Sequence, residues 1–191
     1  MTELWGVAYL LAPLLGGGIF HGICMKYDWL AFLARRIDRG VLVGGKPLFG
    51  ANKTYRGVVA VGIGAAIVLG VQSSLLHRVP NVQRIELFDY GAVNGSLLGF
   101  CVGSAAMLAE LPNSFLKRRL AVAPGESGRG AAGALLYLLD QVDLLLGAWL
   151  VFAWVIDVRA SWVVLSIVIA AVVHQLLTSV TYALGMRRSP W

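Results

Sequence analysis

Two aspartates, three positions apart, lie inside one of the most apolar stretches of this chain. Asp140 and Asp143 are flanked by Gly133–Leu139 and Leu144–Phe152, which are almost wholly apolar. A carboxylate in a membrane segment costs roughly 2.5–3.5 kcal/mol on insertion scales, and residues i and i+3 share one helical face, where their charges repel. A divalent cation such as Mg²⁺, which prefers hard oxygen ligands, would compensate this repulsion. The alternative is a pair bound to Arg or Lys for folding alone.

A third carboxylate and a basic triplet stand earlier in the chain, at Glu110 and Lys117–Arg119. Pro112, between them, is typical of the first turn of a helix. A helix that begins there would direct its free backbone N–H groups toward an anion. Taken alone, the triplet is better explained as charge at a membrane surface.

A segment rich in glycine and cations, Gly44–Gly57, precedes an expected helix and contains Lys53 and Arg56. Glycine-rich turns that lead into a helix N-terminus commonly hold phosphate. The segment is not a P-loop, because the order G-x-x-x-x-G-K-[ST] is absent. It gains weight if it lies on the same face of the protein as the carboxylates.

The elements that must position these groups are membrane helices. Of the 191 residues, 58% are hydrophobic and only 14% are charged, whereas roughly 25% are charged in soluble domains. This composition excludes a disordered chain, a soluble nucleic-acid-binding protein and a disulfide scaffold. It predicts an all-α polytopic membrane protein that forms a single integral-membrane domain over residues 1–191. About five stretches are long enough to cross a hydrocarbon core of roughly 30 Å: Leu4–Met25, Gly57–His77, Tyr90–Ala109, Gly133–Ile156 and Trp162–Gly185.

Glycines inside two of these stretches predict helix packing. Pro13 with Gly16–Gly18 either breaks the first helix or kinks it for packing, and both alternatives are open. The third stretch has glycines four residues apart, which form a flat stripe where another helix approaches closely; the stripe also permits a homodimer. The histidines and the two cysteines share no spacing and are assigned to packing. The stripe consists of Gly91, Gly95, Gly99 and Gly103.

The distribution of basic residues predicts the topology. The positive-inside rule places the N-terminus outside and the C-terminus in the cytoplasm. The loops 26–56 and 110–132 then face the cytoplasm with the candidate binding motifs, and Asp140 lies roughly 10 Å from that face, at 1.5 Å per residue. Thirteen of the 16 basic residues fall on the cytoplasmic side, namely Lys26, Arg35, Arg36, Arg39, Lys46, Lys53, Arg56, Lys117, Arg118, Arg119, Arg129, Arg187 and Arg188.

One face of the protein therefore presents two or three acids and many cations, which suits a polyphosphate with Mg²⁺. Phosphoryl and nucleotidyl transfer need mainly positioning and charge neutralisation. In a membrane protein, the second substrate is expected to be a lipid.

Three strings, at residues 49–57, 114–120 and 139–143, resemble the CDP-archaeol synthase family, which is related to the phosphatidate cytidylyltransferases. The resemblance covers roughly residues 40–155. It implies transfer of CMP from CTP to a lipid phosphate, either an isoprenoid ether glycerol phosphate or phosphatidate, with release of pyrophosphate. It also implies Mg²⁺ as cofactor, CTP, the lipid phosphate and the membrane as partners, no nucleic acid, and a location in the cytoplasmic membrane.

The resemblance implies a role for each matching residue. Asp140 and Asp143 ligate Mg²⁺ together with Glu110. The family usually has Gly-Asp where this chain has Ala109-Glu110, and the longer side chain shifts the ligand position. Lys117 is expected to act in catalysis beside the aspartates. The CTP phosphates or the lipid phosphate are bound by Asn52, Lys53, Thr54, Arg56, Ser114, Arg118 and Arg119, and the Gly/Ser-rich segment Pro124–Ala132 covers the nucleotide.

Three other functions compete with the interpretation as a cytidylyltransferase. A CDP-alcohol phosphotransferase requires an Asp-Gly dipeptide, which the chain lacks. A small ion or solute transporter predicts acids spread through the membrane depth, and no inverted repeat is apparent. A catalytically inactive relative that acts as a membrane scaffold stays open because of Glu110.

Overall fold

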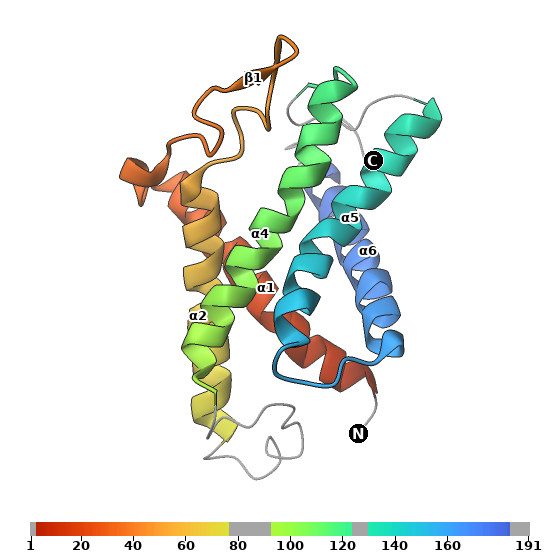
Figure 1. Ribbon diagram of the computed structural model, residues 1–191. Coiled ribbons are helices and arrows are strands. Elements are labelled where there is room, and N and C mark those ends of the chain that lie inside the picture. Colours follow the sequence, from red (N-terminus) through yellow and green to blue (C-terminus); the bar gives the residue numbers. More distant parts are fainter. Residues whose placement is uncertain (1–2, 77–92, 124–129, 184–191) are drawn as a thin grey trace.

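The computed structural model describes residues 3–76, 93–123 and 130–183, and these residues are mainly helical. Long helices that follow one another along the chain run in opposite directions, so the bundle has two ends (Figure 1). We call the end near the β-strands the hairpin end, and the end where α5 turns into α6 the turn end. The long helices of the described residues are α1 (Glu3–Lys26), α2 (Tyr55–Leu76), α4 (Gly95–Arg119), α5 (Gly130–Phe152) and α6 (Ala160–Ala183).

The expected membrane stretches agree with these helices to within a few residues, except in the third. Among the described residues, α1, α2 and α4 are long and apolar enough to cross a membrane. The apolar parts of α5 and α6 that were found are shorter, Val142–Phe152 and Ala160–Val173. A membrane protein is thus confirmed, whereas the number of five spans stays a prediction.

The expected helix start at Pro112 is wrong, and so is the expected loop over residues 110–119. Helix α4 runs unbroken to Arg119 with Pro112 inside it. Its first turn is capped by Asn94, whose Oδ1 accepts a hydrogen bond from the Leu97 N–H at 3.0 Å. A proline inside a membrane helix is tolerated where neighbouring helices and side chains satisfy the freed backbone groups. As a result, Glu110 and the basic triplet are carried by one continuous helix.

Glycines bring α2 and α4 into direct backbone contact. A Cβ on Gly103 would lie 2.5 Å from the Val61 carbonyl oxygen, and one on Gly99 would clash with the Ala65 carbonyl oxygen. The described part of the stripe is therefore used inside the chain, by α2, and is not free for a second copy; Gly91 lies outside the described residues. The homodimer stays a prediction without this support.

Helix α1 is also unbroken, although Pro13 lies inside it. Gly16 and Gly17 serve packing against α2, because a Cβ on Gly16 would lie 3.3 Å from the Gly64 carbonyl oxygen and one on Gly17 would lie 2.8 Å from that of Val61. Of the two alternatives for this segment, the break is therefore wrong.

The segment between α1 and α2 contains a small hairpin, which corrects the expectation of a purely α-helical chain. A short 3-10 helix, η1 (Ala31–Leu33), is followed by β1 (Leu42–Val43) and β2 (Lys46–Pro47). The strands are antiparallel. Gly44 and Gly45 connect them with φ values of 57° and 74°, and two positive φ angles suit a tight hairpin turn that glycine adopts without strain.

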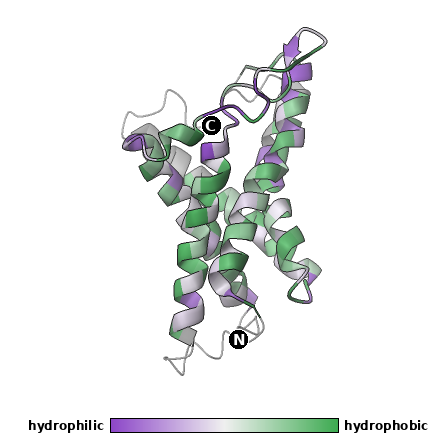
Figure 2. Cartoon of the chain, turned by 60° about the vertical axis from the view of Figure 1, so that its left-hand side comes forward, coloured by the Kyte–Doolittle hydropathy of each residue, from purple (hydrophilic) through white to green (hydrophobic). Residues whose placement is uncertain are grey.

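The shafts of the helices are mainly hydrophobic, whereas hydrophilic residues are most frequent near the helix ends and in the connections at the hairpin end (Figure 2). Large apolar side chains such as Ile19, Leu97 and Leu150 are at least 60% exposed. Such an outer surface is unusual for a soluble protein and is expected where helices contact lipid. The hydrophobic core is formed by all five long helices and includes Leu10 of α1, Leu69 of α2 and Phe152 of α5.

Candidate active site

The two aspartates of α5 face α4, not the lipid. The Asn113 side chain of α4 donates from Nδ2 to Asp140 Oδ1 at 2.6 Å and to Asp143 Oδ2 at 3.1 Å. Asp143 is buried, whereas the Asp140 side chain is 37% exposed. Asp140 lies ten residues into α5, or about 15 Å at 1.5 Å per residue. The pair is therefore reached from the hairpin end through Asp140, with Asp143 beneath it.

The salt-bridge alternative applies to only one member of the pair. Lys117 forms an ion pair with Asp140 Oδ2. Among the described residues, Asp143 has no ion pair, and its Oδ1 accepts a hydrogen bond from the Leu144 N–H at 2.7 Å. The Asn113 side-chain amide is thus the donor that both carboxylates share. The Lys117 ammonium group pairs with Asp140 alone.

Glu110 does not join the aspartates as the third acid of a metal site. It forms an ion pair with Lys53 instead. Within the described ranges, no group of three or more His, Cys, Asp or Glu side chains could hold a metal ion. The three acids expected as ligands therefore do not form one ligand set, because the Glu110 carboxylate is paired with Lys53.

The aspartate pair nevertheless fits Mg²⁺ by the chemistry of its donors. Oxygens of Asp140 and Asp143 converge on one point, at present the Asn113 amide nitrogen. Mg²⁺ is usually bound through one or two carboxylates, with the remaining positions taken by water and substrate phosphates. Two carboxylates are therefore sufficient for a magnesium–nucleotide site.

Arg118 is a buried cation beside the glycine-rich segment. The residue is 8% exposed and makes no ion pair with any described residue; its Nε has no hydrogen-bond partner. Its side chain passes Gly50, where a Cβ would lie 3.5 Å from Arg118 Cδ. Gly50 also has a φ of +105°, which favours glycine. No carboxylate of the described residues pairs with this guanidinium group, so the group is available to bind an anion.

Two of the other expected phosphate-binding residues of this segment, Arg56 and Thr54, already have protein partners. Arg56 donates to Asp28 Oδ1 at 2.6 Å. Thr54 caps α2 through its Oγ1, which accepts a hydrogen bond from the Gly57 N–H at 3.3 Å. Asn52 is exposed in the turn before the helix. Lys53 reaches α4 through its ion pair with Glu110.

Arg119 is used differently from the expectation. Its guanidinium group donates to the carbonyl oxygens of Val43, Lys46 and Pro47 and lies over the Phe115 ring. It therefore attaches the hairpin to α4. Of the other two members of the triplet, Lys117 reaches Asp140 and Arg118 lies beside Gly50. Ser114, also expected there, is buried on α4.

Asp38 organises the glycine-rich segment and was missed by the sequence analysis. Its carboxylate accepts backbone hydrogen bonds from Gly40 at 2.9 Å and from Phe49 and Gly50 at 3.1 Å. Burial acts to raise the pKa of Asp38, but the three backbone donors outweigh it and hold the pKa below its ordinary value. The signal was present, since an Asp two residues before a Gly is typical of an Asx turn.

Two further residues near the site had no role in the sequence analysis. Asn113 bridges the aspartates, and nothing in its sequence context distinguishes it from a surface amide. His21 of α1 lies beside Gly57, whose Cβ would be 3.7 Å from the imidazole Nε2. Only the packing of α1 on α2 places this histidine near the charged groups.

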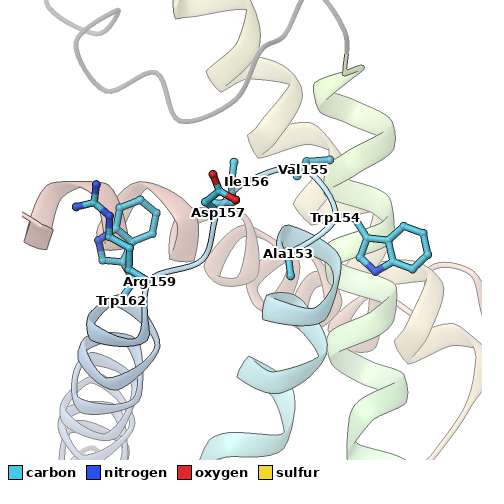
Figure 3. A pocket seen from close by; sticks show the side chains of 7 residues that line it. All are labelled: Ala153, Trp154, Val155, Ile156, Asp157, Arg159 and Trp162. Carbon is cyan, nitrogen blue, oxygen red and sulfur yellow. The ribbon is translucent and has the colours of Figure 1, made fainter.

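A second, open hollow lies at the turn end, away from the aspartates (Figure 3). Trp154 points away from Arg159 and Trp162 in this view, and the Arg159 guanidinium carbon lies 5.3 Å from the centre of the Trp162 ring. Tryptophan and arginine at helix ends are typical of a membrane interface. This hollow has a single acid, Asp157, so it offers no alternative to the aspartate pair.

Paired carboxylates and a buried cation at one end of a mainly helical membrane protein fit an integral-membrane nucleotidyltransferase. Comparisons with known proteins define the family. The CarS-like model, described as CDP-archaeol synthase, matches residues 33–191. The chain belongs to the CDP-archaeol synthase family.

Relatives in this family share about a third of their residues with the chain. The CDP-archaeol synthase of Pyrobaculum aerophilum is 32% identical over 149 residues, which cover 78% of this chain and 77% of the relative. That of Halobacterium salinarum is 34% identical over 169 residues, or 85% and 86% of the two chains. A solved structure, described as an intramembrane enzyme for archaeal membrane lipids biosynthesis, has a TM-score of 0.61 at 23% identity and covers 88% of this chain and 90% of its own. It shows the same fold.

Proposed function

We propose that the protein transfers CMP from CTP to a lipid phosphate and releases pyrophosphate. Two neighbouring faces of α4 support this proposal, because one needs a bound cation and the other needs a bound anion. The Asp140–Asp143 pair, which shares one amide donor, calls for a cation. Arg118, which is buried and has no carboxylate partner in the described part of the chain, calls for an anion. A magnesium–nucleotide complex satisfies both, and the family membership supports this choice.

The residues of the site act mainly by binding and charge neutralisation. Asp140 and Asp143 would hold Mg²⁺, which supplies polarisation of the α-phosphate and neutralises charge on the triphosphate. Arg118, and Lys117 once released from Asp140, would bind phosphate oxygens. Because the lipid phosphate is already ionised at pH 7, the transfer needs no strong general base. A bond forms between an oxygen of the lipid phosphate and the α-phosphorus of CTP. The bond from this phosphorus to the oxygen that bridges it to the β-phosphate breaks, and pyrophosphate leaves.

The lipid substrate we propose is an isoprenoid ether glycerol phosphate, since the relatives named above are CDP-archaeol synthases. Phosphatidate is the second candidate. The cations of the site recognise phosphate in either molecule, and apolar helix surfaces accept either kind of chain. The choice between them is made by an assay.

We also propose five spans in the cytoplasmic membrane, with the N-terminus outside and the active site facing the cytoplasm. Exposed aromatic residues near both ends of the bundle support this arrangement, Tyr27 and Trp29 at the hairpin end and Trp5 and Trp154 at the turn end. Aromatic residues gather at the two membrane interfaces. CTP is available on the cytoplasmic side, where most basic residues are expected.

The test is CTP turnover by the purified full chain with an isoprenoid ether glycerol phosphate, with phosphatidate and with no acceptor, each with and without Mg²⁺. We expect Mg²⁺-dependent formation of a CDP-lipid, and a loss of about 10²-fold or more in the Asp143→Asn variant. Asp157→Asn is the matched control, because this exposed carboxylate lies at the turn end; it should turn over CTP like the unchanged protein. Normal turnover in Asp143→Asn would refute the metal assignment, and no activity with any acceptor would favour the scaffold or the transporter.

A further inference from the structure

Asn113 occupies the centre of the acidic site, although the resemblance assigned it no role. We propose that Asn113 is a ligand of the divalent cation, through its Oδ1, and that its amide holds the two aspartates together when no cation is bound. This inference rests on the proposed function, since it requires the Asp140–Asp143 pair to bind a cation.

The hydrogen bonding of Asn113 is complete on one side only. Its residue is 7% exposed, and its Nδ2 lies between the carboxylates of Asp140 and Asp143, at 2.6 and 3.1 Å. Its Oδ1 is buried and has no hydrogen-bond partner among the residues that the structure describes. An unsatisfied buried acceptor destabilises the folded chain, so a purely structural bridge leaves half of this amide unexplained.

Rotation of the amide about its last side-chain bond exchanges the two ends of the group. This torsion is broad and roughly two-fold, so both orientations are accessible. With the nitrogen toward Asp140 and Asp143, the amide offsets the repulsion between two carboxylates that have no cation. With the oxygen toward them, it adds a third hard oxygen ligand, which Mg²⁺ and Mn²⁺ prefer. One side chain thus suits both states of the site.

Asn113 also accounts for the position of Glu110. The resemblance placed a third acidic ligand at Glu110, yet its carboxylate pairs with Lys53. Asn113 follows it by three residues on α4, close to one helical turn, and contacts both aspartates. The amide therefore provides the third protein oxygen where Glu110 does not, and it carries no additional negative charge that would have to be neutralised in the membrane.

The experiment is Mn²⁺ binding to the purified full chain, followed by electron paramagnetic resonance, together with thermal unfolding with and without Mn²⁺. In Asn113→Ala we expect at least about a tenfold weaker affinity for Mn²⁺, and a smaller increase in Tm on adding Mn²⁺. Gln72→Ala is the matched control. Gln72 is also a membrane amide with a buried Oε1 that lacks a partner, but its Nε2 donates to the Tyr9 carbonyl oxygen, so its loss should leave Mn²⁺ affinity unchanged.

The outcomes separate this inference from the proposed function. Unchanged Mn²⁺ affinity in Asn113→Ala, with a lower Tm, would show a structural bridge only and would overturn the inference. If Asp143→Asn also bound Mn²⁺ normally, the metal site itself would be wrong. Asn113→Asp keeps an oxygen but loses the N–H donors, so it should bind Mn²⁺ at least as tightly while unfolding at a lower temperature without metal. Weaker Mn²⁺ binding in that variant would also overturn the inference.

Discussion

Arg118 shows how a single residue can favour function at the expense of stability. A buried charge that has no carboxylate partner among the described residues destabilises the folded chain unless an anion binds it. We expect Arg118→Met to unfold at a higher temperature, with a gain of about 1 kcal/mol. The same change should reduce CTP turnover by about 10²-fold, because an anion-binding group is lost. Thermal unfolding and turnover of one preparation measure both effects; a lower Tm would show that the guanidinium has a protein partner in the folded state.

Asp38 makes the glycine-rich segment sensitive to acid. Because its pKa is lowered in the folded protein, its stabilising contribution is complete above the ordinary pKa of 3.8 and is lost as the pH falls through the lower folded-state value. At neutral pH we therefore expect slow hydrogen exchange at Gly40 and Phe49, whose N–H groups it accepts, and faster exchange at strongly acidic pH.

Asp38→Asn should already exchange fast at neutral pH, because a neutral amide oxygen is a weaker acceptor for these N–H groups. Exchange followed by mass spectrometry over residues 36–50 measures this difference. Equal protection in the two proteins would show that the backbone of the segment, and not this carboxylate, maintains its shape.

At the scale of elements, α4 carries most of the site, and its position depends on glycine contacts with α2. A Cβ on Gly99 would clash with the backbone of α2. We expect Gly99→Ala to cost about 1–3 kcal/mol and to reduce turnover, since moving α4 displaces Asn113 and Lys117 from the aspartates of α5. Thermal unfolding and the CTP assay measure the two effects.

The matched control is Gly18→Ala on α1. A Cβ on Gly18 would meet nothing within 4 Å, so alanine should stabilise the helix by about 0.5–1 kcal/mol through its better helix propensity. If both variants behaved alike, the close contact between α2 and α4 would be wrong.

The whole molecule has an orientation that labelling can test. Val43 lies in the hairpin and Ala160 begins α6 at the turn end; both are exposed. With Cys24 and Cys101 replaced by serine, we expect a membrane-impermeant maleimide to label Ala160→Cys in intact cells. It should label Val43→Cys only after permeabilisation. The opposite pattern would reverse the orientation, and labelling of both positions from one side would contradict an odd number of spans between them.

The sequence by itself determined the class of fold and the composition of the site. Apolar stretches of sufficient length predict membrane helices wherever they fall, because every backbone polar group in lipid must be satisfied within the helix. The three strings that resemble the family, together with the cost of burying Asp140 and Asp143, indicate the charged centre from the sequence alone. Helix ends were less certain, since Pro112 is compatible with both a helix start and a helix interior that neighbouring helices support.

Only the tertiary structure decided which charged groups meet. The rotation of α4 about its own axis, between α2 and α5, decides which charged side chains pair. Glycine contacts outside the site set this rotation. This rotation pairs Glu110 with Lys53, turns Arg119 to the hairpin and leaves Arg118 without a carboxylate partner among the described residues. It also places Asn113 between the aspartates, where its amide contacts both. Residue types predict what a site can bind, whereas the packing of helices decides which side chains bind it.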